Sequence, residues 1–200
     1  MYFQYGDQEL NYLKSKDKRL AAVIDRLGII RRTVDPDLFS AVVHHIIAQQ
    51  ISTKAQQTIW NRINQTYGQI TPAIICQADI NTLRSFGISA RKAIYLKDFA
   101  QKIIDGTFNP DVLKHMTDAE AIAALSGLKG IGTWTAEMIL LFCLQRPDIF
   151  SFTDLAILNG LKKLYHHRKI DRHLFNKYRR RFSPYGSIAS FYLWAIANDS

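Results

Sequence analysis

The sequence predicts an all-α fold, and three observations support this. Apolar residues recur with helical spacing along nearly the whole chain, residues that cap helices stand before many of these runs, and strand-period runs bounded by hairpin turns are missing. The chain has 200 residues, enough for one domain, or one domain in two lobes, with a sizeable core. Without an internal repeat or long linker, we expect a single domain spanning residues 1–200.

The first half of the chain is predicted to form short helices that begin at caps and end at glycines. Pro36 suits the first turn of a helix, Ser52 and Ser89 can serve as N-caps, and glycine commonly ends a helix. In chain order, we expect helices over Asp7–Lys16, Arg19–Leu27, Asp35–Ile47, Ser52–Tyr67, a short one from Pro72, Asp79–Phe86, and Ser89 to Gly106.

The second half continues the same pattern. Thr117-Asp-Ala-Glu120 is a capping-box sequence, in which the first and fourth side chains each accept a hydrogen bond from the other's backbone amide. The helices expected here cover Ala121–Leu125, Trp134–Leu144, Leu155–Tyr165, Leu174–Arg181 and Ser187–Ala197.

Composition favours a basic intracellular protein and argues against a secreted, membrane-spanning or metal-cluster protein. The net charge of +9 favours a polyanionic partner such as nucleic acid, although a merely soluble basic protein is the alternative. Cys76 and Cys143 lie in apolar segments, which is typical of reduced, buried thiols, and no four-cysteine array for zinc or an iron–sulfur cluster is present. The N-terminus has no signal-peptide pattern, and the apolar run at 138–144 is too short to span a bilayer. We therefore expect a soluble cytoplasmic protein with no membrane partner.

The most informative segment runs from Leu125 to Phe142, with the sequence LSGLKGIGTWTAEMILLF. Two glycines around one apolar residue predict a tight hairpin between two helices, and the backbone amides at the start of the second helix suit a phosphate. An ordinary inter-helix turn is the alternative. The expected phosphate-binding residues are Leu128, Lys129, Gly130, Ile131, Gly132 and Thr133.

This hairpin resembles the helix–hairpin–helix, about residues 117–144, of the HhH-GPD superfamily of base-excision DNA glycosylases. The resemblance covers roughly residues 8–198 and includes the His45-Ile-Ile-Ala-Gln-Gln-Ile-Ser52 segment. Within the superfamily, the chain is most similar to the AlkA-like DNA-3-methyladenine glycosylase II family, without the N-terminal β-domain of some relatives. The resemblance implies a two-lobed helical fold with the active-site cleft between the lobes.

Asp154 occupies the place of the superfamily's catalytic aspartate, after the second hairpin helix. On its own, an aspartate before Leu155 reads as a helix N-cap, and the two roles are compatible. A carboxylate beside the sugar could stabilise positive charge that develops at C1′ as the base departs, and could position or deprotonate the attacking water.

Trp134 stands where superfamily members that also cut the strand have a Schiff-base lysine. The resemblance therefore implies a monofunctional glycosylase, without a lyase step. It also implies that Trp134 and Trp194 line the base pocket, where an indole face attracts a cationic alkylated purine. Tyr192 is a further pocket candidate. Core packing is the alternative for both tryptophans.

The Gln-Gln-Ile-Ser junction matches the place from which the superfamily inserts a side chain into the DNA stack. By that match, Gln50 is the wedge and Gln49 lies beside it, whereas an inter-helix turn is the alternative reading.

No cofactor is required by this reading. The resemblance implies a hairpin site for a monovalent cation, Na⁺ or K⁺, held by the backbone carbonyls of Ser126, Leu128 and Ile131. Lys129 replaces a proline common in the superfamily and adds a charge that could reach the same phosphate. The histidine pairs at 44–45 and 166–167 have no third ligand at metal spacing, which argues against a catalytic metal.

We therefore expect a monomeric, DNA-associated enzyme that flips alkylated purines out of double-stranded DNA and hydrolyses their N-glycosidic bond. Two alternatives stay open from the sequence. One is a glycosylase of the same fold for another damaged base, and the other is a non-catalytic module that binds damaged DNA.

Overall fold

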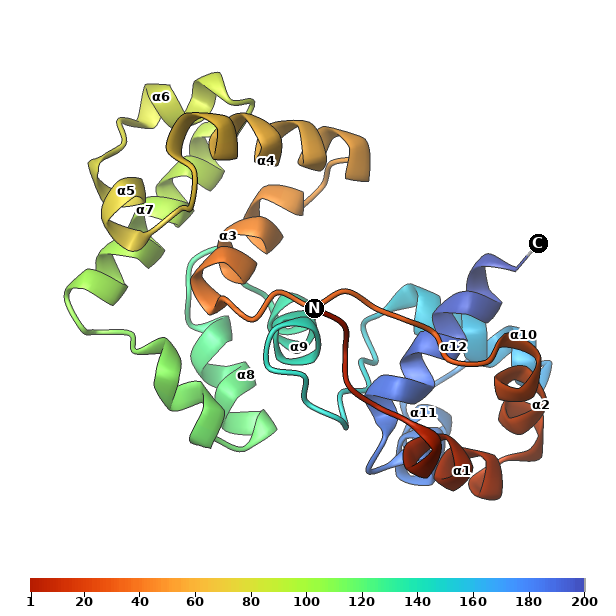
Figure 1. Ribbon diagram of the computed structural model, residues 1–200. Helices are drawn as coiled ribbons and strands as arrows, with labels where there is room; N and C mark the ends of the chain where they lie inside the picture. Colours follow the sequence, from red (N-terminus) through yellow and green to blue (C-terminus); the bar gives the residue numbers. More distant parts are fainter. Residues whose placement is uncertain (200) are drawn as a thin grey trace. The chain divides into compact units, whose positions relative to one another are not determined.

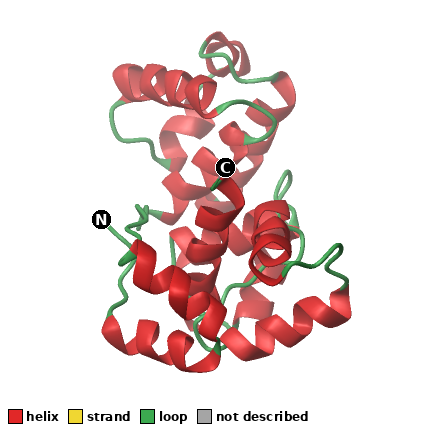
Figure 2. Cartoon of the chain, turned by 90° about the vertical axis from the view of Figure 1, so that its right-hand side faces the viewer, coloured by secondary structure: helices red, strands yellow, loops and turns green. Residues whose placement is uncertain are grey.

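The computed structural model describes residues 1–199, and these residues form helices joined by loops (Figure 2). Among them no β-strand occurs, and Tyr2 and Thr33 make one isolated antiparallel bridge. The all-α prediction is confirmed. The helices are α1 (Asp7–Lys16), α2 (Lys18–Leu27), α3 (Leu38–Ala48), α4 (Thr53–Tyr67), α5 (Pro72–Gln77), α6 (Ile80–Ser85), α7 (Ala90–Ile104), the 3₁₀ helix η1 (Pro110–His115), α8 (Asp118–Ser126), α9 (Thr133–Phe142), α10 (Leu155–Tyr165), α11 (Arg172–Phe182) and α12 (Gly186–Asn198).

The chain divides into two compact units. The central unit comprises residues 35–139, and the terminal unit comprises residues 1–34 and 140–199. In Figure 1 the central unit runs from α3 in orange to the first turns of α9, and the terminal unit combines the red α1 and α2 with the blue α10–α12. The boundary within the chain falls inside α9.

Most helices begin where the sequence predicts because a capping side chain fixes the start. Ser52 and Ser89 accept hydrogen bonds from Ala55 N and Lys92 N, as expected. The start of α3 is wrong by three residues, because Asp37 rather than the Asp35-Pro36 pair provides the cap. The same reason moves the start of α11 back to Arg172, since Asp171 is its cap. The 3₁₀ helix η1 was not predicted.

The terminal unit is built around the close approach of α10 and α12. Gly160 in α10 lies so near α12 that an added Cβ would sit 2.3 Å from the Leu193 carbonyl oxygen. The core of this unit contains the wholly buried rings of Phe175, Phe182 and Phe191. A glycine in the middle of a helix costs roughly 1 kcal/mol relative to alanine, and here it permits the tight helix contact.

The central unit packs around α7, which contacts α3, α5 and α6. Phe39 of α3 stacks on Phe99 of α7 with 5.4 Å between ring centroids. Both cysteines are free thiols; Cys143 is buried as predicted, whereas Cys76 is only partly so. No helix in residues 1–199 combines the length and the apolar character that a membrane crossing requires.

Candidate active site and nucleic-acid interface

The terminal unit holds two buried carboxylates at helix starts. Asp17 caps α2 and pairs with Arg181, and Asp154 stands at the start of α10. Its Oδ1 accepts hydrogen bonds from the backbone amides of Ala156 and Ile157 at 2.9 Å each, so Asp154 is the N-cap of α10. The same oxygen accepts a hydrogen bond from the indole Nε1 of Trp194 at 3.2 Å. Only 7% of Asp154 is exposed. Three donors and the positive end of the α10 dipole therefore stabilise this negative charge and orient the carboxyl group.

The connector that carries Asp154 is fastened to the start of α12. The Asp148 carboxylate accepts hydrogen bonds from Ser183 Oγ at 2.6 Å and from the Gly186 amide at 3.0 Å. The Ser187 hydroxyl accepts from the Ile149 amide at 2.9 Å and donates to the Arg146 carbonyl at 2.5 Å. These bonds limit the freedom of the segment between α9 and Asp154.

Trp194 lies beside Asp154 and is half-buried. Its ring stacks on Phe142, with 5.8 Å between centroids and an interplanar angle of 18°. The guanidinium of Arg32 stands 5.8 Å from the ring centroid, within cation–π range. The sequence predicts Trp194 as a lining of the base pocket; the structure gives it a defined second role, in which it orients the carboxylate through Nε1.

Tyr192 is a core residue in this structure rather than the lining of an open pocket. Its side chain is wholly buried, and its hydroxyl donates to the Gly28 carbonyl at 2.8 Å. Burial raises the pKa of the Tyr192 phenol well above its ordinary value. Helical geometry explains why Tyr192 is in the core while Trp194 lies beside Asp154. Residues two positions apart in a helix differ by about 200° and so point to opposite faces. Tyr192 and Trp194 cannot share one face of α12.

In the central unit, α8, the turn at 127–132 and α9 form the predicted helix–hairpin–helix. Leu128 and Ile131 are each only 5% exposed and anchor the turn, and the Ile131 amide donates to the Leu128 carbonyl at 3.1 Å. The capping box of Thr117 and Glu120 at the start of α8 is present. The first-turn amides of α9 have no acceptor within the helix, as at any helix start, and are suited to an anion.

The two glycines of the hairpin play different parts. Gly130 has φ +84°, and an added Cβ would lie 2.3 Å from the Tyr95 ring, so its lack of a side chain is required by the fold. Gly132 has an ordinary φ, and a Cβ there would meet no atom within 4 Å. The small size of Gly132 is therefore not a packing requirement, and it leaves space above the hairpin for another molecule.

Lys129 does not present an unpaired charge. Its ammonium donates to the Asp98 carboxylate of α7 at 2.6 Å. The hydrogen bond from Lys129 is the main cause that lowers the pKa of Asp98, and Lys102 adds to it. The expectation that Lys129 reaches a phosphate stays a prediction, and such a contact would compete with this partly exposed ion pair.

The junction between α3 and α4 places Gln50 on the surface in a strained conformation. Gln50 is exposed and has φ +57°, in the left-handed region. The Lys92 ammonium of α7 holds the turn, donating to the carbonyls of Ile47 at 2.8 Å and of Gln49 at 2.5 Å. Burial lowers the pKa of Lys92. The turn is thus preset, and Gln50 projects from it.

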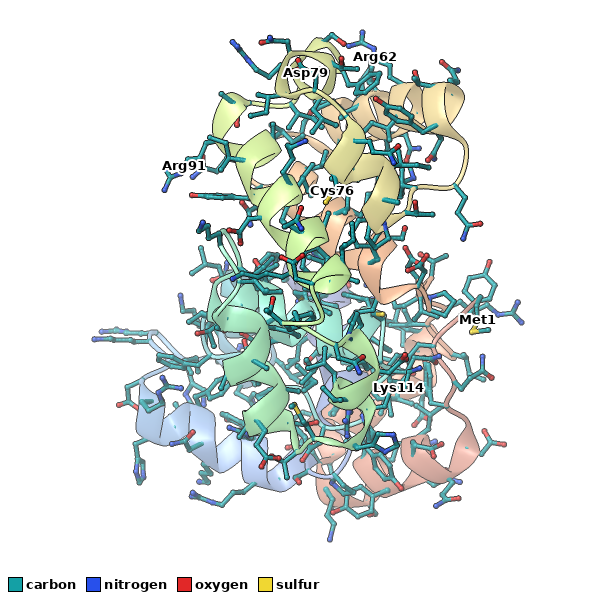
Figure 3. The ribbon with its side chains drawn as sticks, turned by 90° about the vertical axis from the view of Figure 1, so that its left-hand side faces the viewer. Met1, Arg62, Cys76, Asp79, Arg91 and Lys114 are labelled. Carbon is teal, nitrogen blue, oxygen red and sulfur yellow. The ribbon has the colours of Figure 1, made fainter. Side chains whose placement is uncertain are left out.

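Gln49 does not stand beside Gln50 as a second wedge. Its side-chain Nε2 donates to the Gly130 carbonyl at 2.6 Å, so it ties the α3–α4 turn to the hairpin. This corrects the expectation for Gln49 and leaves Gln50 as the projecting residue. Figure 3 shows Arg91 projecting from the first turn of α7, the helix that supports both the turn and the hairpin.

Trp134 lies in the first turn of α9 and is 43% exposed. The alternative of a buried core tryptophan is therefore wrong, and a large aromatic surface stands next to the amides of the hairpin.

The hairpin also contains oxygens that fit a hard cation. Ser126 Oγ is buried and has no hydrogen-bond partner among the described residues, and it belongs to a residue whose carbonyl the family resemblance assigns to the site. A monovalent cation would take such oxygens together with the Leu128 and Ile131 carbonyls. Elsewhere in residues 1–199, no group of three His, Cys, Asp or Glu side chains is placed to hold a metal ion.

Three supporting residues were missed from the sequence: Lys92, Tyr95 and Gly160. Lys92 and Tyr95 lie on one face of α7 at a spacing of three, together with Asp98, and this run of polar side chains at helical spacing was the available signal. Gly160 interrupts the apolar face of α10, and such a glycine often marks a close helix contact.

Known proteins resemble this chain over most of its length. The family model described as HhH-GPD superfamily base excision DNA repair protein matches residues 43–184. DNA-3-methyladenine glycosylase 1 of Schizosaccharomyces pombe is 32% identical over 190 residues, which cover 92% of this chain and 83% of the relative. The putative DNA-3-methyladenine glycosylase YfjP of Bacillus subtilis is 28% identical over 88% of this chain and 64% of its own.

Two solved structures have the same fold. The crystal structure of a DNA-3-methyladenine glycosidase from Bacillus halodurans has a TM-score of 0.87 and 30% identity, covering 99% of this chain and 93% of that one. A Schizosaccharomyces pombe 3-methyladenine DNA glycosylase in complex with abasic DNA has a TM-score of 0.82 and 28% identity, covering 94% and 95% of the two chains.

Proposed function

Because the chain belongs to the HhH-GPD superfamily of base excision DNA repair proteins, we propose that it is a monofunctional DNA glycosylase for alkylated purines of the 3-methyladenine type. It would hydrolyse the N-glycosidic bond in double-stranded DNA and leave an abasic site. We further propose that the protein acts on DNA as a monomer, inside the cell.

The observation that carries the proposal is the environment of Asp154. Two amides and an indole N–H hold one oxygen of a carboxylate that is otherwise shut away from solvent. A helix cap needs only the amides. The buried cap Asp17 has the charged guanidinium of Arg181 as its third donor, whereas the third donor to Asp154 is a neutral indole. The third donor, from Trp194 some 40 residues along the chain, fixes the orientation of the group beyond what capping requires.

The reaction follows from this charge. The bond between C1′ and the purine nitrogen breaks, the base leaves with the electron pair, and C1′ becomes positively charged. An alkylated purine already carries positive charge and so departs as a neutral base. Asp154 stabilises the charge at C1′, water adds to C1′, and Asp154 or solvent accepts the proton of that water.

The central unit would supply the DNA contacts. The amides at the start of α9, beside the open space at Gly132, suit a backbone phosphate. Gln50 would fill the gap left by the flipped nucleotide, because it projects from a turn whose conformation Lys92 fixes in advance. The exposed Trp134 offers an indole face for stacking on a flat, positively charged base.

A hairpin cation would complete this surface. Na⁺ or K⁺ held by the Ser126, Leu128 and Ile131 carbonyls would place a positive charge next to the phosphate. The chemistry at C1′ needs no other cofactor in this proposal.

The test is a survey by mass spectrometry of the bases released from methylated genomic DNA. We expect 3-methyladenine and other alkylpurines in the supernatant with the wild-type protein and none above background with Asp154→Asn. Release of only oxidised or deaminated bases, from suitably damaged DNA, would identify a glycosylase for another lesion. Tight binding to damaged duplex without release of any base would identify a non-catalytic module.

A further inference from the structure

The positive charge of the chain is concentrated in one short segment. Residues 162–181 contain nine of the 26 lysines and arginines and one of the 17 aspartates and glutamates. The net charge of this segment is therefore +8 out of a total of +9, and the other 180 residues together carry +1. The segment covers the end of α10, the following loop and nearly all of α11, within the terminal unit (Figure 1).

Some of these cations have structural partners inside the unit. Arg181 pairs with the buried carboxylate of Asp17 at 2.5 Å. Arg172 lies 4.0 Å from the centroid of the Phe152 ring, and Lys163 donates to the Ala197 and Asp199 carbonyls. These three side chains stabilise the fold and need no external ligand.

Five others have no such partner. We call them the basic face: Arg168, Lys169, Lys177, Arg179 and Arg180. All five are exposed, and their side chains make no hydrogen bond or ion pair with any residue from 1 to 199. The buried side of α11 is formed by Phe175, Tyr178 and Phe182. Lys177 and Arg180 each stand two positions beyond a buried ring, about 200° around the helix, so they lie on the solvent side of α11.

The positive charges of the basic face repel one another. Like charges three or four residues apart on a helix destabilise it, and Lys177 and Arg180 are such a pair. Arg179 is placed to interact favourably with the C-terminal end of the α11 dipole, but Arg168 and Lys169 in the loop are not. A ligand with a dense row of negative charges would relieve the repulsion.

We propose that the basic face is a second DNA-binding surface, which binds phosphates of undamaged duplex independently of the hairpin of the central unit. Duplex DNA carries one charge per about 1.7 Å of its axis, and α11, with 11 residues, is about 16 Å long. Several phosphates therefore fit along it, and three of the five side chains are arginines, which bind phosphate through two parallel hydrogen bonds. This inference rests on the proposed function only in that DNA is the substrate.

The test compares two double variants with the same change in net charge. Lys177→Gln/Arg180→Gln removes two cations of the basic face. Lys14→Gln/Arg26→Gln removes two cations from α1 and α2, and these two are already paired with Asp25 and Asp199. Affinity for an undamaged duplex is measured at several salt concentrations, and base release is measured under single turnover at saturating protein.

We expect the basic-face variant to bind undamaged duplex several-fold more weakly at low salt. The slope of log affinity against log salt should fall in magnitude by about 2, since each lost phosphate contact contributes about 0.9. The control variant should change neither value, and both variants should release base at the wild-type rate when saturated. An unchanged slope in the basic-face variant, or an equal change in the control, would overturn the proposal.

Two further arms separate the alternatives. If the wild-type protein binds vesicles rich in anionic lipid through the basic face while DNA affinity is unaffected by Lys177→Gln/Arg180→Gln, the face is a membrane-binding surface and the DNA proposal is wrong. Failure of the proposed glycosylase activity would show instead as absent base release with normal, salt-sensitive DNA binding, so the two failures are distinguishable.

Discussion

At the scale of single residues, Asp154 decides between a structural and a catalytic role. Asn ranks beside Asp as an N-cap, so Asp154→Asn should keep the start of α10 and the thermal stability. The negative charge is lost, and we expect single-turnover base release to fall about a hundredfold or more. That loss corresponds to roughly 2.7 kcal/mol or more of transition-state stabilisation.

Trp194→Phe is the matched control for this experiment. It keeps an aromatic ring near Phe142, removes the Nε1 donor to Asp154 and reduces the size of the ring system. A positioning role predicts a smaller loss of base release than in Asp154→Asn, with lesion binding retained. Near-normal release by Asp154→Asn would refute the catalytic assignment, whatever the control does.

His45 makes the stability of the protein depend on pH. Burial, with His44 as a lesser cause, lowers the pKa of His45 to about 4. In the unfolded chain a histidine titrates near 6.5, so on acidification the unfolded state takes up the proton first. The stabilisation is therefore complete above about pH 6.5 and is lost as the pH falls toward 4, by about 3 kcal/mol in all.

Chemical denaturation across this pH range measures the effect. His45→Leu should flatten the curve of unfolding free energy between about pH 6.5 and 4. His115→Gln, a change at an exposed histidine, should leave the curve as it is in the wild type. Identical curves for His45→Leu and the wild type would assign the acid sensitivity to other groups.

At the scale of elements, the two hairpin glycines should respond differently to the same substitution. Gly130→Ala places a Cβ into the Tyr95 ring at a left-handed φ, so we expect a loss of stability in thermal unfolding. Gly132→Ala meets no protein atom, so the fold should be unaffected while the methyl group occupies the space above the hairpin. Its affinity for undamaged and damaged duplex should fall alike. Normal DNA binding by Gly132→Ala would show that the hairpin does not bind the DNA phosphates.

The turn between α3 and α4 should matter only where a base stack must be opened. Gln50→Ala removes the projecting side chain, and Lys92→Met removes the ammonium that holds the Ile47 and Gln49 carbonyls. Both variants should lose more base release on duplex than on single-stranded substrate.

Lys92→Arg is the conservative variant for this element, because it keeps a donor cation and should restore part of the duplex activity. Equal losses on the two substrates would make Gln50 an ordinary turn residue and Lys92 a purely structural one.

At the scale of the whole molecule, the chain should perform hydrolysis alone. By the resemblance, Trp134 stands where a Schiff-base lysine would act in members that also cut the strand, so we expect water to be the nucleophile at C1′. Borohydride treatment during the reaction should trap no covalent protein–DNA adduct, and strand breaks should appear only after alkali. An adduct seen on a denaturing gel would show that another amine of this chain attacks the sugar.

Much of the fold and part of the site could be predicted from the sequence because these features are encoded locally. A helix start depends on a capping side chain within three residues, as at Ser52 and Thr117, and the hairpin depends on glycines two positions apart. The cap position of Asp154 can be read from adjacent residues in the same way, whereas its assignment as the catalytic aspartate came from the resemblance to the superfamily. The start of α3 was predicted at the Asp35-Pro36 pair, and it was wrong because Asp37 provides the cap.

The roles of the remaining site residues were decided by tertiary contacts. Gln49 bonds to a carbonyl 81 residues away, Lys129 pairs with a carboxylate 31 residues away, and Trp194 donates to Asp154 across 40 residues. The residues next to each of these side chains in the sequence do not determine whether it contacts DNA or another part of the protein. The partner that packing brings near determines this. Helix positions and helix caps are thus determined by short stretches of sequence. Which polar residue projects toward DNA, which one joins two elements and which one is buried is decided only in the folded chain, because hydrogen bonds and ion pairs act only over a few ångströms.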